Sequence, residues 1–469
     1  MGLIKAPTCL IWDSSGTDGE INQQLSNGKG IARLDFVTLC LASLLALLLA
    51  PGDATQFTSK LDSANVQAPQ ASSNPPHSPE TGPKLTVEQA LDLAEKYSPI
   101  LSGASAEVAG ARAAIQTASA YINPRLYTFQ GKQSARPVAN PGVPGLLQQY
   151  GVTQAIELPN VRRSRIRVAD LGRASSEIGV AAVRLAVRAD VKHAFYEVLR
   201  RREEISHAEE NLRLLEDLRR RTGVQVNVGE AAKLELTRAE AEIAIGQNAV
   251  KTARLLYVAG LSALRAAVSA PLPENVFPEG NLDISLALPA LDQVRGDMLA
   301  NHPVMVQART EVDRARAQME SEKAQRLPEF TLDASYSIQP DLRYSQFGFS
   351  IPVPLVNRRK GPIAEAAAAI TRAEATLNQR RLELTASLES AYGQYLVADQ
   401  QVKSFESGAL RQANAAVEAA QAAYRLGARG IIEVLDAQRV LQRVRGDLLD
   451  AQYERENALI NLQELGAVK

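Results

Sequence analysis

Cysteine, aromatic residues and net charge are all scarce in this 469-residue sequence. The chain has two cysteines, one tryptophan and 5% aromatic residues. Both cysteines, Cys9 and Cys40, lie near the N-terminus, so the rest of the chain has neither a disulfide framework nor a thiolate metal site. Lys+Arg and Asp+Glu both number 52, and a chain without net charge has no global field to attract nucleic acid.

The sequence also lacks the motifs of enzymes and of resident cofactors. Gly28-Lys29-Gly30 has neither the earlier glycine nor the Ser/Thr of a phosphate-binding loop. The four histidines have no second metal-binding residue at ligand spacing, and they are His77, His193, His207 and His302. We therefore expect a protein that is not an enzyme and that has no cofactor and no dedicated metal site.

The N-terminal residues predict export from the cytoplasm. Arg33 precedes an apolar run over residues 36–50, and small residues follow up to Ala54, as in a secretory signal that is cleaved after this alanine. The run is shorter than the ~20 residues of a membrane-spanning helix; a retained anchor is the alternative. We assign residues 1–54 to an N-terminal extension with a signal peptide, and residues 55–84, rich in Ser, Pro, Gln and Asn, to a flexible leader.

The remainder of the chain contains an internal sequence repeat with two copies. Shifts of 204, 197 and 198 residues superimpose three successive parts of one half on the other, in the same order. The marker pairs are Pro124 with Pro328, Asn160 with Asn357, and Gly229 with Gly427. A match that keeps its order over this length predicts a tandem duplication, with repeats at residues 85–270 and 285–469.

Within each repeat the hydrophobic period changes twice. Helical spacing over 86–122 and 291–326 gives way to period-two alternation, which is clearest from Phe330 to Ile338 and from Phe347 to Leu355. This alternation predicts a β-hairpin with one apolar and one polar face. Helical spacing then resumes over 160–222 and 362–425, breaks at 223–229 and 427–430, and continues to about residues 268 and 465.

The strands predict an oligomer. Two hairpins supply four strands of about ten residues, and a tilted strand needs ~9–11 residues to cross a bilayer. Four strands cannot close a barrel, and an open edge in lipid leaves backbone groups unsatisfied. Three chains give twelve strands, a permissible closed barrel. The predicted fold is therefore mainly α with a small membrane β part, a trimer forming a 12-stranded β-barrel. A small soluble hairpin layer packed on helices is the alternative.

Two motifs resemble the TolC-type outer-membrane factors of Gram-negative efflux systems. Residues 350–361 (SIPVPLVNRRKG) resemble the strand-to-helix junction of this family, in particular of the branch that serves cobalt–zinc–cadmium resistance pumps. Residues 424–437 (YRLGARGIIEVLDA) resemble its periplasmic tip. The resemblance covers residues 85–466. It implies a homotrimer in outer-membrane lipid, with a long periplasmic α-helical barrel below the β-barrel.

The implied activity is that of a passive exit duct. The duct would carry heavy-metal cations or small toxic compounds, driven by an inner-membrane RND-type pump and joined to it by a periplasmic adaptor protein. The resemblance places adaptor docking at the turn Arg425-Leu426-Gly427, and Val228 and Gly229 hold the equivalent place in the first repeat. Glycine suits such a turn because it adopts positive φ without strain.

The resemblance also implies a charged aperture. The family carries carboxylates at the positions of Glu433 and Asp436, which share one helix face at a spacing of three. Threefold symmetry would turn them into an acidic ring that favours cations. Arg429 matches a position that pairs with neighbouring carboxylates and helps to hold the aperture shut. A periplasmic coiled-coil scaffold without a pore is the alternative function.

Overall fold

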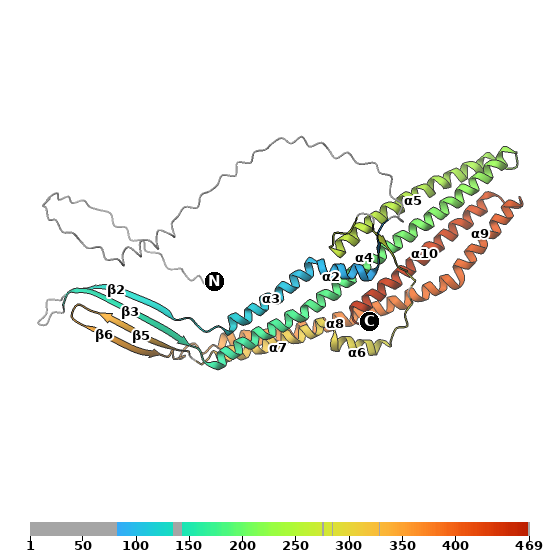
Figure 1. Ribbon diagram of the computed structural model, residues 1–469. Coiled ribbons are helices and arrows are strands. Elements are labelled where there is room, and N and C mark those ends of the chain that lie inside the picture. Colours follow the sequence, from blue (N-terminus) through green and yellow to red (C-terminus); the bar gives the residue numbers. More distant parts are fainter. Residues whose placement is uncertain (1–81, 135–142, 274–275, 284, 328, 468–469) are drawn as a thin grey trace, which may run out of the picture. The chain divides into compact units, whose positions relative to one another are not determined.

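The computed structural model describes most of the chain after the leader (Figure 1). The described residues are 82–134, 143–273, 276–283, 285–327 and 329–467. The expected signal peptide, most of the expected leader and both cysteines lie outside them.

Both repeats have the same order of elements, so the tandem duplication is confirmed. The first repeat contains α2 (Val87–Tyr97), α3 (Pro99–Ser119), β2 (Arg125–Gln133), β3 (Gly145–Ile156), α4 (Pro159–Asn227) and α5 (Lys233–Val268). The second repeat contains α6 (Leu291–Asn301), α7 (Pro303–Ala324), β5 (Phe330–Ile338), β6 (Arg343–Ser350), α8 (Lys360–Ser404), the π-helical turn η1 (Phe405–Ala409), α9 (Leu410–Arg425) and α10 (Ile431–Glu464). Two short strands, β1 (Lys84–Leu85) and β4 (Phe277–Pro278), pair in parallel.

The first helix expected in each repeat is broken at a proline. Ser98 has φ −61° and ψ 121°, and His302 has φ −62° and ψ 131°, so each lies in the extended region. Each precedes a proline, whose ring disfavours helical backbone in the residue before it. The side chains of Ser98 and His302 then cap α3 and α7. The prediction of continuous helices over 86–122 and 291–326 was wrong for this reason.

One antiparallel sheet joins the two repeats. Its strand order is β2-β3-β5-β6, and the central pairing of β3 with β5 connects the first hairpin to the second. The last strand ends at Ser350, whereas the sequence pattern predicted that it would continue to Leu355. Pro352 and Pro354 have no backbone N–H to donate to a neighbouring strand, which explains the earlier end.

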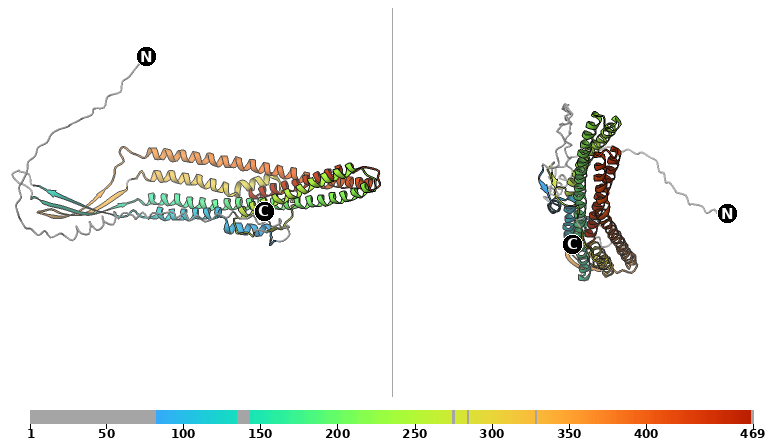
Figure 2. Two further views of the ribbon diagram at one scale, coloured as in Figure 1. Left: turned by 90° about the horizontal axis from the view of Figure 1, so that it is seen from above. Right: turned by 90° about the vertical axis from the view of Figure 1, so that its right-hand side faces the viewer.

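The helices bury their apolar faces in separate clusters. One cluster joins α2, α4 and α5 with the β1–β4 segment, and includes Phe195, Leu199 and Leu264. A second cluster joins α6, α8 and α10 around Leu388 and Tyr395. The α4–α5 and α9–α10 hairpins lie side by side in both views of Figure 2, with their turns at the same end. In the described part of the chain no helix offers an apolar stretch of the length that crossing a membrane requires.

Candidate functional site

The two helix–turn–helix tips have the same backbone hydrogen bonds. In the first tip, Glu230 N donates to Gln225 O at 2.8 Å, and in the second Ala428 N donates to Ala423 O at 2.9 Å. Each of these bonds closes a turn that contains a glycine at positive φ. Gly229 has φ 83° in the first tip, and Gly427 has φ 68° in the second. A bond of this span closed by a glycine at positive φ is the Schellman arrangement, which ends a helix without leaving its last carbonyls unpaired.

The two tips pack on one another. Leu215 and Leu218 of α4 form a buried cluster with Ile431, Val434 and Leu435 at the start of α10. The hydroxyls of Thr222 and Tyr424 lie 2.8 Å apart in a buried hydrogen bond that connects the two hairpins. The expected docking residues of the two repeats therefore belong to one packed structure.

Apolar side chains at the ends of these tips face solvent. Leu426 is 83% exposed, Val228 64% and Val224 60%. Beside them a cavity of about 340 Å³ is lined by residues of both tips, among them Val224 and Arg425. Since exposed apolar groups next to a cavity are typical of a surface that another protein covers, the tips have the chemistry of a docking site.

The expected aperture residues lie at the start of α10. Arg429 and Glu433 form an exposed ion pair with 3.8 Å between Nη1 and Oε1, and Asp436 follows on the same face. Exposed pairs of this kind are weak. The structure thus brings Arg429 and Glu433 together, but it pairs Asp436 with another residue.

The pattern analysis missed the arginine and the glutamates that surround the aperture residues. Arg439 Nη1 lies 3.2 Å from Asp436 Oδ1, and the same guanidinium also binds Glu242 of α5. Glu235 of the first repeat and Glu433 of the second each place a carboxylate oxygen within 4 Å of the position that a Cβ would occupy on Gly430. The shift of 198 residues that superimposes Glu235 on Glu433 was the available signal.

The sheet carries most of its large apolar side chains on the more exposed face, whereas Phe129, which is 64% exposed, lies on the other. In β5, Leu332 is 44% and Tyr336 42% exposed, whereas the alternating Ser335 and Ser337 are 7% and 6% exposed. Phe347 of the neighbouring β6 is 87% exposed on the same face as Ala334. This is the reverse of a soluble sheet, whose apolar face is covered.

The other face of the sheet is polar and internally bonded. The Tyr127 hydroxyl donates to Asp333 Oδ2 at 2.9 Å, and Gln149 Nε2 donates to Ser335 Oγ at 3.2 Å. The Tyr127 ring lies over Gly151, where a Cβ would come within 2.2 Å of it. Gly151 is thus required for this contact.

The comparisons with known proteins agree with this arrangement. Cobalt-zinc-cadmium resistance protein CzcC of Cupriavidus metallidurans is 27% identical over 366 residues, which cover 77% of this chain and 85% of CzcC. The crystal structure of CusC superimposes with a TM-score of 0.68 at 19% identity over 81% of this chain and 91% of that one. The outer-membrane channel OprN gives a TM-score of 0.71 at 18% identity, covering 81% and 90%.

The family follows from a match to each repeat. The family model described as outer membrane efflux protein matches residues 90–270 and again residues 294–467, which together are well over half of the chain. This is a family of efflux channel proteins and not of enzymes, and it has members named for heavy-metal resistance. The chain belongs to the outer membrane efflux protein family.

Proposed function

We propose that the chain is one subunit of a homotrimeric outer-membrane channel, the passive exit duct of a tripartite efflux system. Its β-sheet lies in the outer membrane and its long helices lie in the periplasm. The channel carries heavy-metal cations or small toxic compounds that an inner-membrane RND-type pump supplies through a periplasmic adaptor protein. Residues 85–270 and 285–469 are the two repeats of this subunit.

The observation that carries the proposal is the four-stranded sheet with its apolar face outward. Phe347, Phe349 and Leu126 are between 74% and 87% exposed, and on the opposite face Asp333, Ser335 and Tyr127 bond to one another or to polar neighbours. A sheet with this distribution suits lipid on one side and water on the other.

The edges of the sheet favour a closed assembly of several copies. β2 and β6 are the outer strands of the order β2-β3-β5-β6, so each has one side without a neighbour in the described chain. In lipid such edges leave each backbone group unsatisfied at a cost of several kcal/mol. Pairing β6 of one subunit with β2 of the next, three times over, closes a barrel of twelve strands.

The tips supply the periplasmic functions of the channel. The exposed Val228 and Leu426, together with Arg425 and the two turn glycines, form the adaptor-docking surface. Glu433 and Asp436 from three subunits line the aperture, where Arg439 and Arg429 reduce their net charge. An aperture with three copies of this set passes cations in preference to anions because carboxylate rings attract them.

Heavy-metal cations are the favoured cargo because of the relatives. CzcC is named for cobalt, zinc and cadmium resistance. In the described residues no group of three or more His, Cys, Asp or Glu is placed to hold a metal ion. A duct needs only weak and transient contacts with its cargo, so cations can pass without a dedicated site.

Two measurements test this function. Purified full-length protein in a planar bilayer is expected to give discrete conductance steps, and cells without the gene are expected to lose tolerance to zinc, cobalt or cadmium only while the pump and adaptor are present. A periplasmic scaffold without a pore would give a soluble protein and no conductance steps. That result would overturn the proposal.

A further inference from the structure

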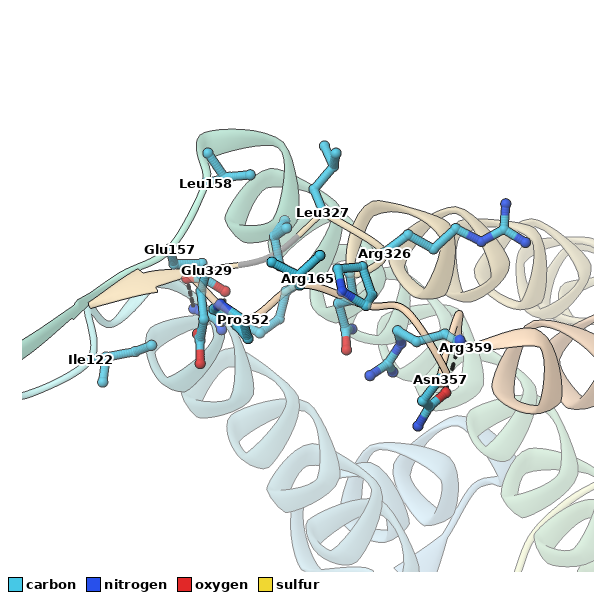
Figure 3. A pocket seen from close by; sticks show the side chains of 14 residues that line it. Ile122, Glu157, Leu158, Arg165, Arg326, Leu327, Glu329, Pro352, Asn357 and Arg359 are labelled. Atoms are coloured by element: carbon cyan, nitrogen blue, oxygen red, sulfur yellow. Dashed lines mark hydrogen bonds and ion pairs between the residues drawn. The ribbon is translucent and has the colours of Figure 1, made fainter. Parts of the chain in front are cut away.

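A cavity lies where the strands end and the helices begin. It measures about 520 Å³ and is lined by all four connections between sheet and helices, as Figure 3 shows. Ile122 comes from the α3–β2 connection, Leu158 from β3–α4, Leu327 from α7–β5 and Pro352 from β6–α8. Both repeats therefore contribute to one enclosure at the boundary of the sheet.

The segments around this cavity are strongly basic in an otherwise neutral chain. Residues 157–165, 320–329 and 355–361 contain eight Arg or Lys and four Glu, whereas the whole chain has no net charge. Three of these glutamates are paired with basic side chains of the same segments, Glu157 with Arg165, Glu320 with Lys323 and Glu322 with Arg359, and the fourth, Glu329, lines the cavity. The excess positive charge is thus gathered at the end of the sheet.

Four basic side chains of this boundary have no partner among the described residues, namely Arg163 of α4 and three others. Arg326, Arg358 and Lys360 are exposed, and none of their side chains forms a hydrogen bond or an ion pair with a described residue. Arg326 itself lines the cavity (Figure 3). Arg358 and Lys360 are the neighbours in the chain of its lining residue Arg359. Unpaired cationic groups around an enclosure are typical of a site for an anion.

Exposed apolar side chains border the same basic groups. Val353 is 69%, Leu355 75% and Val356 98% exposed, directly before Arg358. In the α3–β2 connection Tyr121 is 77% exposed, and the Arg162 guanidinium lies 4.5 Å from the centre of its ring. Apolar residues, an aromatic ring and basic side chains in adjacent layers are the pattern of a membrane–water interface.

We propose that this boundary binds an anionic phospholipid of the inner leaflet of the outer membrane. Arg326, Arg358 and Lys360 hold the phosphate of its headgroup, and its acyl chains lie along the exposed residues from Ile351 to Val356. The inference rests on the proposed membrane position of the sheet. The bound lipid fixes the height of the channel in the membrane and covers apolar surface that water would otherwise meet.

Native mass spectrometry of the purified trimer tests the proposal. Delipidated protein is titrated with dioleoylphosphatidylglycerol or with dioleoylphosphatidylcholine, which has no net charge. We expect tighter binding of the anionic lipid and a loss of at least about tenfold in its affinity in R326Q/R358Q/K360Q, since each basic group near an anionic lipid surface strengthens binding about fivefold. The matched control K251Q/R381Q/R443Q removes three basic groups on α5, α8 and α10 that are also exposed and have no partner among the described residues, and it keeps wild-type affinity.

Besides the absence of a preference for the anionic lipid, three results would overturn the proposal. Equal loss in both triple variants would show a non-specific charge effect, and displacement of the lipid by inorganic phosphate would show a site for the free anion. Dissociation of R326Q/R358Q/K360Q trimers without any lipid would show that these side chains bind a neighbouring subunit instead. The proposed channel is tested separately, by conductance measurements on the same preparations. Conductance steps without a lipid preference would reject only the lipid site. Absence of conductance in the wild-type protein would reject the channel.

Discussion

A carboxyl group without a full set of partners is buried between two of the long helices. Glu456 of α10 is 4% exposed, and its Oε2 has no hydrogen-bond partner among the described residues. Burial raises the pKa of Glu456 to about 7, and the adjacent Tyr196 hydroxyl, Lys192 and Arg455 only partly oppose this shift. The charged form of Glu456 is therefore destabilised at neutral pH.

This carboxyl makes folding stability depend on pH. The pKa of Glu456 is about 7 in the folded chain and has its ordinary value of 4.5 in the unfolded chain. Between pH 4.5 and about pH 7 the folded chain therefore binds a proton that the unfolded chain does not. Stability is greatest below this window and falls as pH rises through it. We expect Glu456→Gln to match wild type at about pH 4.5 and to raise the melting temperature of the trimer at about pH 8, with a gain of up to about 3 kcal/mol.

The pH dependence of the gain in melting temperature distinguishes the loss of a buried charge from a change in packing, which would act equally at every pH. Asp447→Asn is the control, since this residue is exposed on the same helix and should alter melting at neither pH. A gap between Glu456→Gln and wild type that stays constant from acid to alkaline pH would contradict the assignment.

The turn glycines of the tips differ from glycines inside the helices. Gly427 has φ 68°, where a Cβ adds strain, whereas Gly393 of α8 is in regular helix with open space around it. We expect Gly427→Ala to destabilise the trimer by about 1 kcal/mol and Gly393→Ala to leave it unchanged or stabilise it by up to about 1 kcal/mol. Thermal unfolding of both variants measures the difference, and equal effects would show that the turn conformation carries no cost.

The π-helical turn η1 explains why the shift between the two sequence repeats changes from 197 to 198 residues. Buried Ile205 corresponds to buried Val402 at a shift of 197, and buried Leu215 corresponds to buried Ala413 at a shift of 198. The second repeat therefore has one additional residue between these positions, where α4 is continuous and η1 interrupts the second helix. A π-turn accommodates one extra residue and keeps the helix on either side in phase.

If η1 holds the extra residue, one deletion in this helix is tolerated and another is not. Deletion of Gly408 inside η1 converts the turn to α-helix without rotating either flank, so the trimer should form and melt within a few degrees of wild type. Deletion of Gly393 displaces the buried Tyr395, Ala398 and Val402 by one position, about 100° around the helix, and should abolish the trimer on native gels. Loss of the trimer in both variants would reject η1 as the site of the extra residue.

The sequence predicted the elements better than their ends. The hydrophobic period and the internal sequence repeat were sufficient to predict the two hairpins and the long helices, because hairpins and helices each impose a regular spacing on apolar residues. The break before Pro99 could have been predicted from the restriction that proline imposes on Ser98, and the end of β6 from Pro352. The π-turn could not, because spacing alone shows an extra residue without showing where the backbone absorbs it.

The candidate site was predicted unevenly for a similar reason. The turn glycines carry a local signal, and the structure gives both of them positive φ. The partners of Glu433 and Asp436, Arg429 and Arg439, lie only four and three residues away, a spacing that the sequence shows. The contact of Arg439 with Glu242 on α5 has no such local signal. Such contacts depend on how α5 packs against α10, which a single sequence does not show.

In the assembled channel, the acidic side chains near the tips should decide which ions pass. In the proposed trimer Glu433 and Asp436 face the narrow end of the pore, so Glu433→Gln with Asp436→Asn removes six negative charges from it. We expect the cation preference in planar bilayers to fall severalfold, measured as a shift in reversal potential under a salt gradient. The loss should be greatest at low ionic strength, because salt screens charges more than about 10 Å apart at 0.1 M.

A second pair of carboxyl groups provides the control for this experiment. Glu418 of α9 and Asp447 of α10 are exposed and have no partner among the described residues. Glu418→Gln with Asp447→Asn removes the same charge by the same substitutions, but it lies further from the tips. An equal shift in reversal potential in both double variants would mean that ions respond to the charge of the whole channel, and the constriction would then have to be sought elsewhere. A shift confined to the first variant would place the selective step at the start of α10, where both repeats contribute carboxylates beside Gly430.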